Sequence, residues 1–179
     1  MRSSVLIAGI GNIFQGDDAF GVAVAHKLGT LEFPTEVKVM DVGIRSIDLA
    51  FALLDQHDLT ILVDVTSRGC APGTLYTIEI QPDDIPELDE DSVIVNSHSL
   101  NPVRVLALAK SMGASFKRVL LVGCEPLVLT HDESGHIGLS EVVQAAVDSA
   151  VQIIRRMVQE FTHGGAITIE EEVYSHEPG

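Results

Sequence analysis

The chain has 179 residues, 46% of them hydrophobic, which is enough apolar material for one compact domain with a continuous core. Its 26 Asp and Glu outnumber 11 Lys and Arg, and the net charge of -15 argues against binding to nucleic acid phosphate. The two cysteines, Cys70 and Cys124, form no C-x-x-C pair, so we expect neither a thiolate metal site nor a disulfide framework and interpret both as bystanders.

The first half of the chain alternates short apolar runs with helical patterns. Residues 5–8 predict a strand that is too short for a membrane span and has no small-residue cleavage site, so we expect a cytoplasmic protein without a signal peptide. Residues 18–28 predict a helix, and Asp17 suits its N-cap. Next come a strand at 37–40 followed by Asp41, a helix at 46–54, and a strand at 59–63 followed by Asp64.

The second half continues the alternation. Its predicted elements are a strand at 75–80, an acidic loop at 81–92, a strand at 93–95, a helix at 100–112, a strand at 118–122 and a helix at 140–161. Because parallel strands need crossover connections, this order indicates a single α/β domain with a mostly parallel twisted sheet and helices on both faces. We expect the domain to span residues 1–161 and leave 162–179 as a C-terminal tail of undefined order.

The turn GIGNIFQGDD, residues 9–18, follows the first predicted strand. A dinucleotide-binding turn of the G-x-G-x-x-G type would have its third glycine where Phe14 stands. Asp17 and Asp18 would also repel a pyrophosphate bound at this place. We therefore interpret the turn as one that presents oxygen ligands to a cation, which counts against a nucleotide-binding protein.

Asp18, Asp64 and His98 each follow a predicted strand. In open α/β sheets, the carboxyl ends of the strands border the crevice in which ligands bind, so the fold can bring these three side chains together. Two carboxylates and an imidazole suit a divalent ion such as nickel or zinc and leave coordination positions open for reaction. Without a cation, the two carboxylates would raise each other's pKa.

Simpler explanations exist for each of these residues. A single aspartate after a strand is often a helix cap or a turn residue, and a histidine in a loop is usually a solvated surface residue. We interpret His131 and His136 as loop residues of a polar turn rather than as a second metal pair. The acidic stretch 83–91 is expected to be a solvated rim, with steering of a basic partner as the alternative. Cys124 is expected to face the core.

Six short motifs together resemble those of the hydrogenase maturation proteases. They are GIGN at 9–12, GDDAFG at 16–21, DVG at 41–43, VD at 63–64 with APGT at 71–74, SHSL at 97–100 and LVGCEP at 121–126. The similarity runs from the first strand to the last helix. It implies an endopeptidase that removes a C-terminal extension from the precursor of the large subunit of nickel-iron hydrogenase after nickel insertion.

The resemblance also implies roles for particular residues. The family's metal-contacting positions correspond to Asp18, Asp64 and His98, with aspartate in place of the glutamate often found at the first. The nickel is expected to be the one carried by the precursor, with zinc or another divalent ion as a substitute. Asp18 or Asp64 is expected to assist a water nucleophile, with activation of that water by the ion together with a carboxylate as the alternative, and the family is described as either aspartic-type or nickel-dependent. Asp41 is a candidate for orienting His98 or a loop.

A non-enzymatic alternative uses the same three ligands. In that alternative the chain is a nickel-binding chaperone or docking module for hydrogenase assembly that cleaves nothing. For both functions we expect a monomer whose partner is the hydrogenase large-subunit precursor, with no membrane and no nucleic acid involved.

Overall fold

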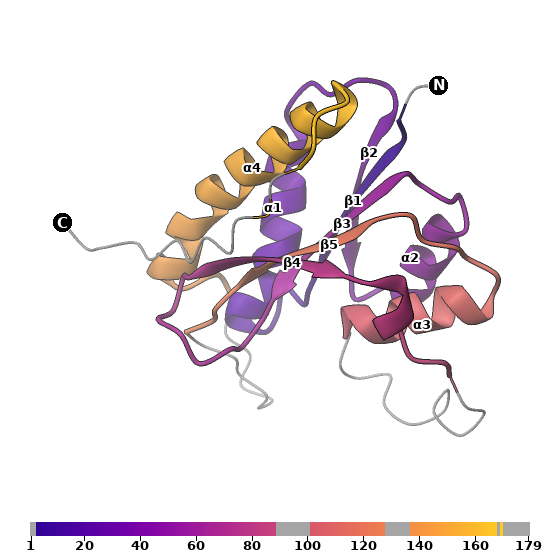
Figure 1. Cartoon of the computed structure of the whole chain (residues 1–179). Helices are drawn as coiled ribbons and strands as arrows, with labels where there is room; N and C mark the ends of the chain where they lie inside the picture. Colours follow the sequence, from indigo (N-terminus) through magenta and orange to yellow (C-terminus); the bar gives the residue numbers. More distant parts are fainter. Residues whose placement is uncertain (1–2, 89–100, 128–136, 168, 170–179) are drawn as a thin grey trace.

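A computed structural model describes residues 3–88, 101–127, 137–167 and 169 (Figure 1). Its strands are β1 (Val5–Ile10), β2 (Val37–Gly43), β3 (Leu59–Val65), β4 (Leu75–Ile80) and β5 (Val119–Cys124). Its helices are α1 (Phe20–Gly29), α2 (Ser46–Leu53), α3 (Pro102–Ser111) and α4 (Glu141–Thr162), with short 3-10 helices η1 (Gly16–Ala19) and η2 (Pro82–Asp84).

The strands form one five-stranded sheet in the order β2-β1-β3-β5-β4. β1 pairs in parallel with β2 and β3, and β3 pairs in parallel with β5, whereas β4 is antiparallel to β5. The predicted mostly parallel sheet is therefore confirmed. Because parallel strands end at the same edge, the carboxyl ends of β1, β2, β3 and β5 lie together.

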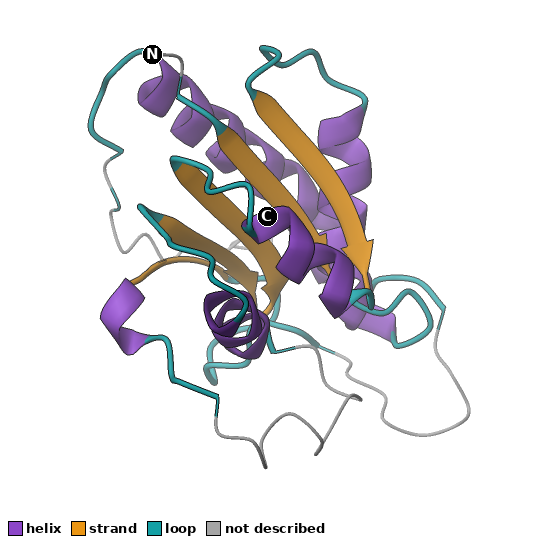
Figure 2. Cartoon of the chain, turned by 90° about the vertical axis from the view of Figure 1, so that its right-hand side faces the viewer, coloured by secondary structure: helices purple, strands orange, loops and turns teal. Residues whose placement is uncertain are grey.

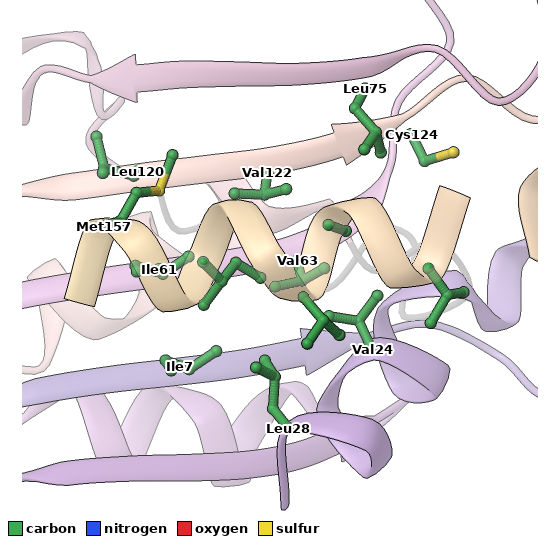
Figure 3. Packing of buried hydrophobic residues seen from close by; sticks show 14 of the residues in the cluster. Ile7, Val24, Leu28, Ile61, Val63, Leu75, Leu120, Val122, Cys124 and Met157 are labelled. Carbon is green, nitrogen blue, oxygen red and sulfur yellow. The ribbon is translucent and has the colours of Figure 1, made fainter. Parts of the chain in front are cut away.

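Helices cover both faces of the sheet, as predicted (Figures 1 and 2). One apolar core lies between the sheet and helices α1 and α4, and the other between the sheet and helices α2 and α3. Figure 3 shows the first core, in which Val24 and Leu28 of α1 and Met157 of α4 pack on apolar side chains of the strands. This packing holds the carboxyl edge of the sheet in place from both sides.

Several element boundaries differ from the predicted ones. The predicted helix at 18–28 is divided into η1 and α1, so Asp18 lies in the short 3-10 helix. Asp41 and Asp64 lie inside β2 and β3 rather than after them, because those strands continue to Gly43 and Val65. The strand predicted at 93–95 lies outside the described residues.

The C-terminal region packs further than the sequence indicated. Helix α4 ends at Thr162, and beyond it Ile167 is buried in the core on the α1 and α4 face. The carbonyl oxygen of Ile167 accepts a hydrogen bond from Arg118 at 3.4 Å. Of the helices in the described ranges, none combines the length and the apolar character needed to cross a membrane.

Candidate active site

Gly21 allows α1 to begin directly against the carboxyl ends of β1 and β3. A Cβ atom at this position would lie 2.2 Å from the carbonyl oxygens of both Ile10 and Val63. Only glycine permits so close an approach of helix and strands. The segment just before α1, which contains Asp18, is thereby held beside the strand end that contains Asp64.

The glycine-rich turn closes onto Asp18. The backbone N–H of Asn12 donates to Oδ2 of Asp18 at 2.8 Å. Gly11 has a φ of +144°, and a Cβ atom there would lie 1.8 Å from the carbonyl oxygen of Asp18. A phosphate-binding turn would offer the backbone N–H of this position to its ligand. Here the backbone N–H of Asn12 instead orients the Asp18 carboxylate. This geometry favours the interpretation of the turn as a carboxylate-presenting loop.

Asp64 is a buried carboxylate near Asp18. It is 5% exposed, and its Oδ1 accepts a hydrogen bond from the N–H of Val65 at 2.8 Å. Burial, followed by the charge of Asp18, raises the pKa of Asp64 well above its ordinary value. The structure therefore brings together the two aspartates that the sequence selected, on two segments that are far apart in the chain.

The third predicted ligand, His98, lies outside the described residues, as do His131 and His136. Within the described part of the chain, no group of three or more His, Cys, Asp or Glu side chains is arranged to hold a metal ion. The pair formed by Asp18 and Asp64 offers oxygen donors that suit a divalent cation when a further ligand completes the set. Metal binding by all three residues stays a prediction.

Asp17 has a different role from its neighbour, and its prediction as an N-cap is wrong. Ala19 precedes the first residue of α1, and Asp17 is completely buried. Oδ1 of Asp17 accepts the N–H of Ser140 at 2.7 Å. Oδ2 accepts the N–H of Leu127 at 2.8 Å and the hydroxyl of Ser140 at 3.0 Å. Asp17 thus joins η1 to the segment after β5 and to the start of α4.

Glu125 is a second buried carboxylate at the same edge of the sheet. It is 5% exposed and lies directly after β5. Its Oε2 accepts the Tyr76 hydroxyl at 2.6 Å and the N–H of Arg68 at 2.8 Å, and its Oε1 accepts the N–H of Gly69 at 3.3 Å. Burial alone would raise the pKa of Glu125, but the hydrogen bond from Tyr76 and those from backbone amides outweigh burial and lower it.

Cys124, the last residue of β5, is buried as predicted. Burial, with smaller contributions from the charges of Asp17 and Glu125, raises the pKa of the Cys124 thiol to about 12. The thiol is therefore protonated at neutral pH and is a poor nucleophile. The other cysteine, Cys70, is exposed.

Asp41 contacts a histidine that the sequence did not point to. Its Oδ2 lies 2.7 Å from Nε2 of His26 in α1, and both side chains are partly exposed. The role of Asp41 in orienting His98 concerns residues beyond the described ranges and stays a prediction. Of the predicted acidic rim, Asp83, Asp84 and Glu87 are exposed, which confirms a solvated surface for that part.

Sequence reasoning assigned no role to Glu125 or His26. Glu125 carries the same signal that selected Asp64, namely an acidic residue at the end of an apolar strand, and could have been found by it. His26 lies on a helix 15 positions before Asp41, and no periodicity links the two. Their contact arises only because α1 packs beside β2.

Comparison with known proteins gives a consistent result. A family model described as hydrogenase maturation protease matches residues 22–157. The hydrogenase expression/formation protein HupM of Azotobacter chroococcum is 35% identical over 151 residues, which are 84% of this chain and 69% of the relative. The hydrogenase maturating endopeptidase HybD of Escherichia coli superposes with a TM-score of 0.66 and 25% identity, over 90% of this chain and 94% of that one. A hydrogenase 2 maturation peptidase from a Thaumarchaeota archaeon also gives a TM-score of 0.66, with 30% identity over 88% and 99% of the two chains.

Proposed function

Because this chain belongs to the hydrogenase maturation protease family, we propose that it removes the C-terminal extension from the nickel-loaded precursor of the nickel-iron hydrogenase large subunit. Asp18, Asp64 and His98 contact the nickel, which the precursor carries, so the ion is part of the substrate. Contact with the ion then acts as a checkpoint, because a precursor without nickel lacks the feature that the enzyme recognises.

The burial of Asp64 beside Asp18 is the observation that carries this proposal. Two carboxylates in a partly desolvated site repel each other, which is unfavourable for folding unless a cation offsets their charge. A divalent ion supplied by the substrate provides that charge at the moment of binding. Because the ion relieves the repulsion between the two carboxylates, the site should bind the metal-loaded precursor more tightly than the metal-free one.

The position of α3 supports the inclusion of His98. Side chains alternate between the two faces along a strand, so Asp64 points to the same face of the sheet as Leu62, the face that α2 and α3 cover. Helix α3 begins at Pro102, four positions after His98 in the sequence. An imidazole supplied from just before α3 would complete a mixed oxygen and nitrogen donor set that suits nickel.

For hydrolysis, we propose that a water molecule attacks the carbonyl carbon of the scissile peptide bond. Asp18 or Asp64 accepts a proton from this water as the new C–O bond forms. The tetrahedral intermediate then breaks its C–N bond, and the departing amine takes up a proton. The aspartate that accepted the proton from water is placed to return it to that amine.

The proposal is tested by incubating the purified protein with nickel-loaded and metal-free large-subunit precursor and measuring the precursor mass. We expect the C-terminal extension to be lost only from the nickel-loaded form. An unchanged mass with stable complex formation would favour the non-hydrolytic chaperone instead. Equal cleavage of both forms would show that the ion is not recognised.

A second prediction concerns His98. Replacing it with Ala should abolish cleavage of nickel-loaded precursor and leave the circular dichroism spectrum unchanged. Because imidazole must be neutral to bind a metal, nickel affinity measured by calorimetry should fall in the wild-type protein as the pH drops below about 6. The pH dependence in this range should be weaker in His98→Ala, and full activity of that variant would remove His98 from the site.

A further inference from the structure

Two buried carboxylates outside the proposed metal set lie near the end of β5: Glu125 directly follows the strand, and Asp17 accepts the N–H of Leu127. Asp17 is next to Asp18 in the sequence, and Glu125 binds the connection that follows Asp64. Both are at most 5% exposed, and both accept hydrogen bonds from backbone N–H groups of distant segments. Burying a carboxylate is costly unless such donors satisfy it, so each marks a place where the fold is strongly constrained.

Glu125 fixes the segment that leaves β3 just after Asp64. Besides the side-chain contacts, its backbone N–H donates to Thr74 at 2.8 Å and its carbonyl oxygen accepts the N–H of Gly73 at 2.8 Å. The side chain holds the start of the same β3–β4 connection at Arg68 and Gly69. Glu125 therefore binds both ends of the β3–β4 connection, which begins two residues after Asp64.

Asp17 fixes the segment that carries Asp18. The N–H that it accepts from Leu127 comes from only two residues after Glu125. Its contacts with Ser140 anchor the same carboxylate to the start of α4. The segment 125–127 is thus bound to the Asp64 side of the site through Glu125 and to the Asp18 side through Asp17.

We propose that Asp17 and Glu125 are positioning residues that set the separation of Asp18 and Asp64 by binding both aspartate-bearing segments to the end of β5. Neither residue is assigned contact with the substrate. The effect on cleavage rests on the function proposed above, whereas the effect on the geometry of the aspartates does not. Misplacement of reacting groups by about 1 Å can cost roughly 100-fold in rate, so a modest shift of either segment is enough to be measured.

Isosteric amides test the two residues in different ways. In Asp17→Asn, either orientation of the amide places an NH₂ group against a backbone N–H, because both Oδ atoms accept one. In Glu125→Gln, the NH₂ group can replace Oε1, whose contact with Gly69 is the long one at 3.3 Å, and Oε2 keeps its contacts with Arg68 and Tyr76. The first substitution should therefore be the more harmful, and Glu125→Ala more harmful than Glu125→Gln.

The experiment measures kcat and KM for cleavage of the nickel-loaded precursor. It also measures hydrogen exchange of the backbone amides of Asn12 and Val65. These amides donate to Asp18 and Asp64, so their protection reports on the two carboxylates without any substrate. For Asp17→Asn we expect kcat to fall ~10–100-fold with KM changed by less than about threefold, and protection of the Asn12 amide to decrease. For Glu125→Ala we expect a similar loss of kcat and weaker protection of the Val65 amide, with recovery in Glu125→Gln.

Asp58→Asn is the matched control. Asp58 is also a carboxylate that accepts a distant backbone N–H, that of Ser4 at 2.8 Å, but it lies just before β3, at the opposite edge of the sheet. The Asp58→Asn substitution should lower the stability of the fold while leaving kcat and the protection of both backbone amides unchanged. Where Asp17→Asn fails to fold, Ser140→Ala removes only the 3.0 Å hydroxyl contact, since the Ser140 side chain makes no capping hydrogen bond in α4. Tyr76→Phe likewise removes a single donor to Glu125.

The proposal is overturned if folded Asp17→Asn and Glu125→Ala behave like Asp58→Asn, with lower stability but wild-type kcat and amide protection. Absence of cleavage by the wild-type protein would instead reject the proposed function. In that case, hydrogen exchange alone still decides whether Asp17 and Glu125 position the two aspartates.

Discussion

Adjacent aspartates in the GDD sequence differ because of what each side chain meets. Asp17 turns inward and accepts backbone donors from segments more than 100 residues away in the chain, whereas Asp18 is only partly buried and lies beside Asp64. Local sequence could predict that acidic groups gather at this turn. It could not predict which of the two is structural, because the deciding N–H groups come from Leu127 and Ser140.

Asp64→Asn should raise the stability of the metal-free protein while removing its cleavage activity. The ionised form of Asp64 is disfavoured in the folded protein, so this group stabilises the fold at pH values below its unfolded pKa and loses that contribution as the pH rises through the raised folded pKa. An amide has no such cost and can still accept the Val65 N–H. We expect the metal-free variant to have a higher Tm than wild type at neutral pH, with little difference near pH 3, and to lack cleavage activity.

The measurement is thermal unfolding at a series of pH values, with the protein freed of divalent ions by a chelator. Asp58→Asn provides the opposite case, because hydrogen bonds from Lys117 and Ser4 lower the pKa of Asp58. That variant should be less stable than wild type at neutral pH and approach wild type as the pH falls. A neutral-pH Tm of Asp64→Asn below that of wild type would mean that Asp64 is stabilised by contacts other than those seen here.

At the scale of elements, apolar patterning predicted strands and helices well where one face is buried. The last helix was placed within one residue at each end because its buried positions recur with helical spacing. The division of the first helix into η1 and α1 was not predicted, since it depends on packing of Gly21 against β1 and β3.

Gly21→Ala tests how much this helix–sheet contact contributes. The added Cβ would lie within 2.7 Å of three backbone atoms, and backbone cannot move aside as a flexible side chain can. We expect a loss of about 3 kcal/mol or more in the free energy of unfolding, at the upper end of overpacking costs, together with loss of cleavage. Urea denaturation gives the stability change.

Gly29→Ala in the same helix is the control. A Cβ at Gly29 meets nothing within 4 Å, and its φ is not in the left-handed region. It should be neutral or stabilise the protein by about 0.4–1 kcal/mol through the unfolded state. Similar effects of the two substitutions would indicate that helix propensity, rather than contact with the strand ends, decides the outcome at Gly21.

At the scale of the whole molecule, the alternation of elements was sufficient to predict that the sequence-distant Asp18 and Asp64 would meet at one edge of the sheet. The antiparallel direction of β4 was also within reach, because residues 66–74 between β3 and β4 form no helix and are too few for a parallel crossover. The links among η1, the end of β5 and the start of α4 could not be predicted from the sequence, because they depend on side chains that bind specific backbone groups far away in the chain.

From the net charge of -15 we predict that added salt stabilises the folded protein. Repulsion among surplus carboxylates opposes the compact state, whereas surface ion pairs such as Arg118 with Glu79 and Arg45 with Asp48 favour it. Exposed pairs of this kind contribute about 0–1 kcal/mol each, so we expect repulsion to dominate. Added NaCl screens both effects and should therefore raise the Tm, by about 2–4 °C for each kcal/mol of repulsion removed.

Calorimetry at about 0.01 M and 0.5 M NaCl at neutral pH, where the Debye length is roughly 30 Å and roughly 4 Å respectively, checks this prediction. Repeating the scan near the pI of 4.6, where the net charge is small, provides the control, because the repulsive contribution should then disappear. A Tm that falls with salt at neutral pH would mean that the ion pairs outweigh the surplus of negative charge. The surplus would then be distributed so that like charges seldom lie near one another on the folded surface.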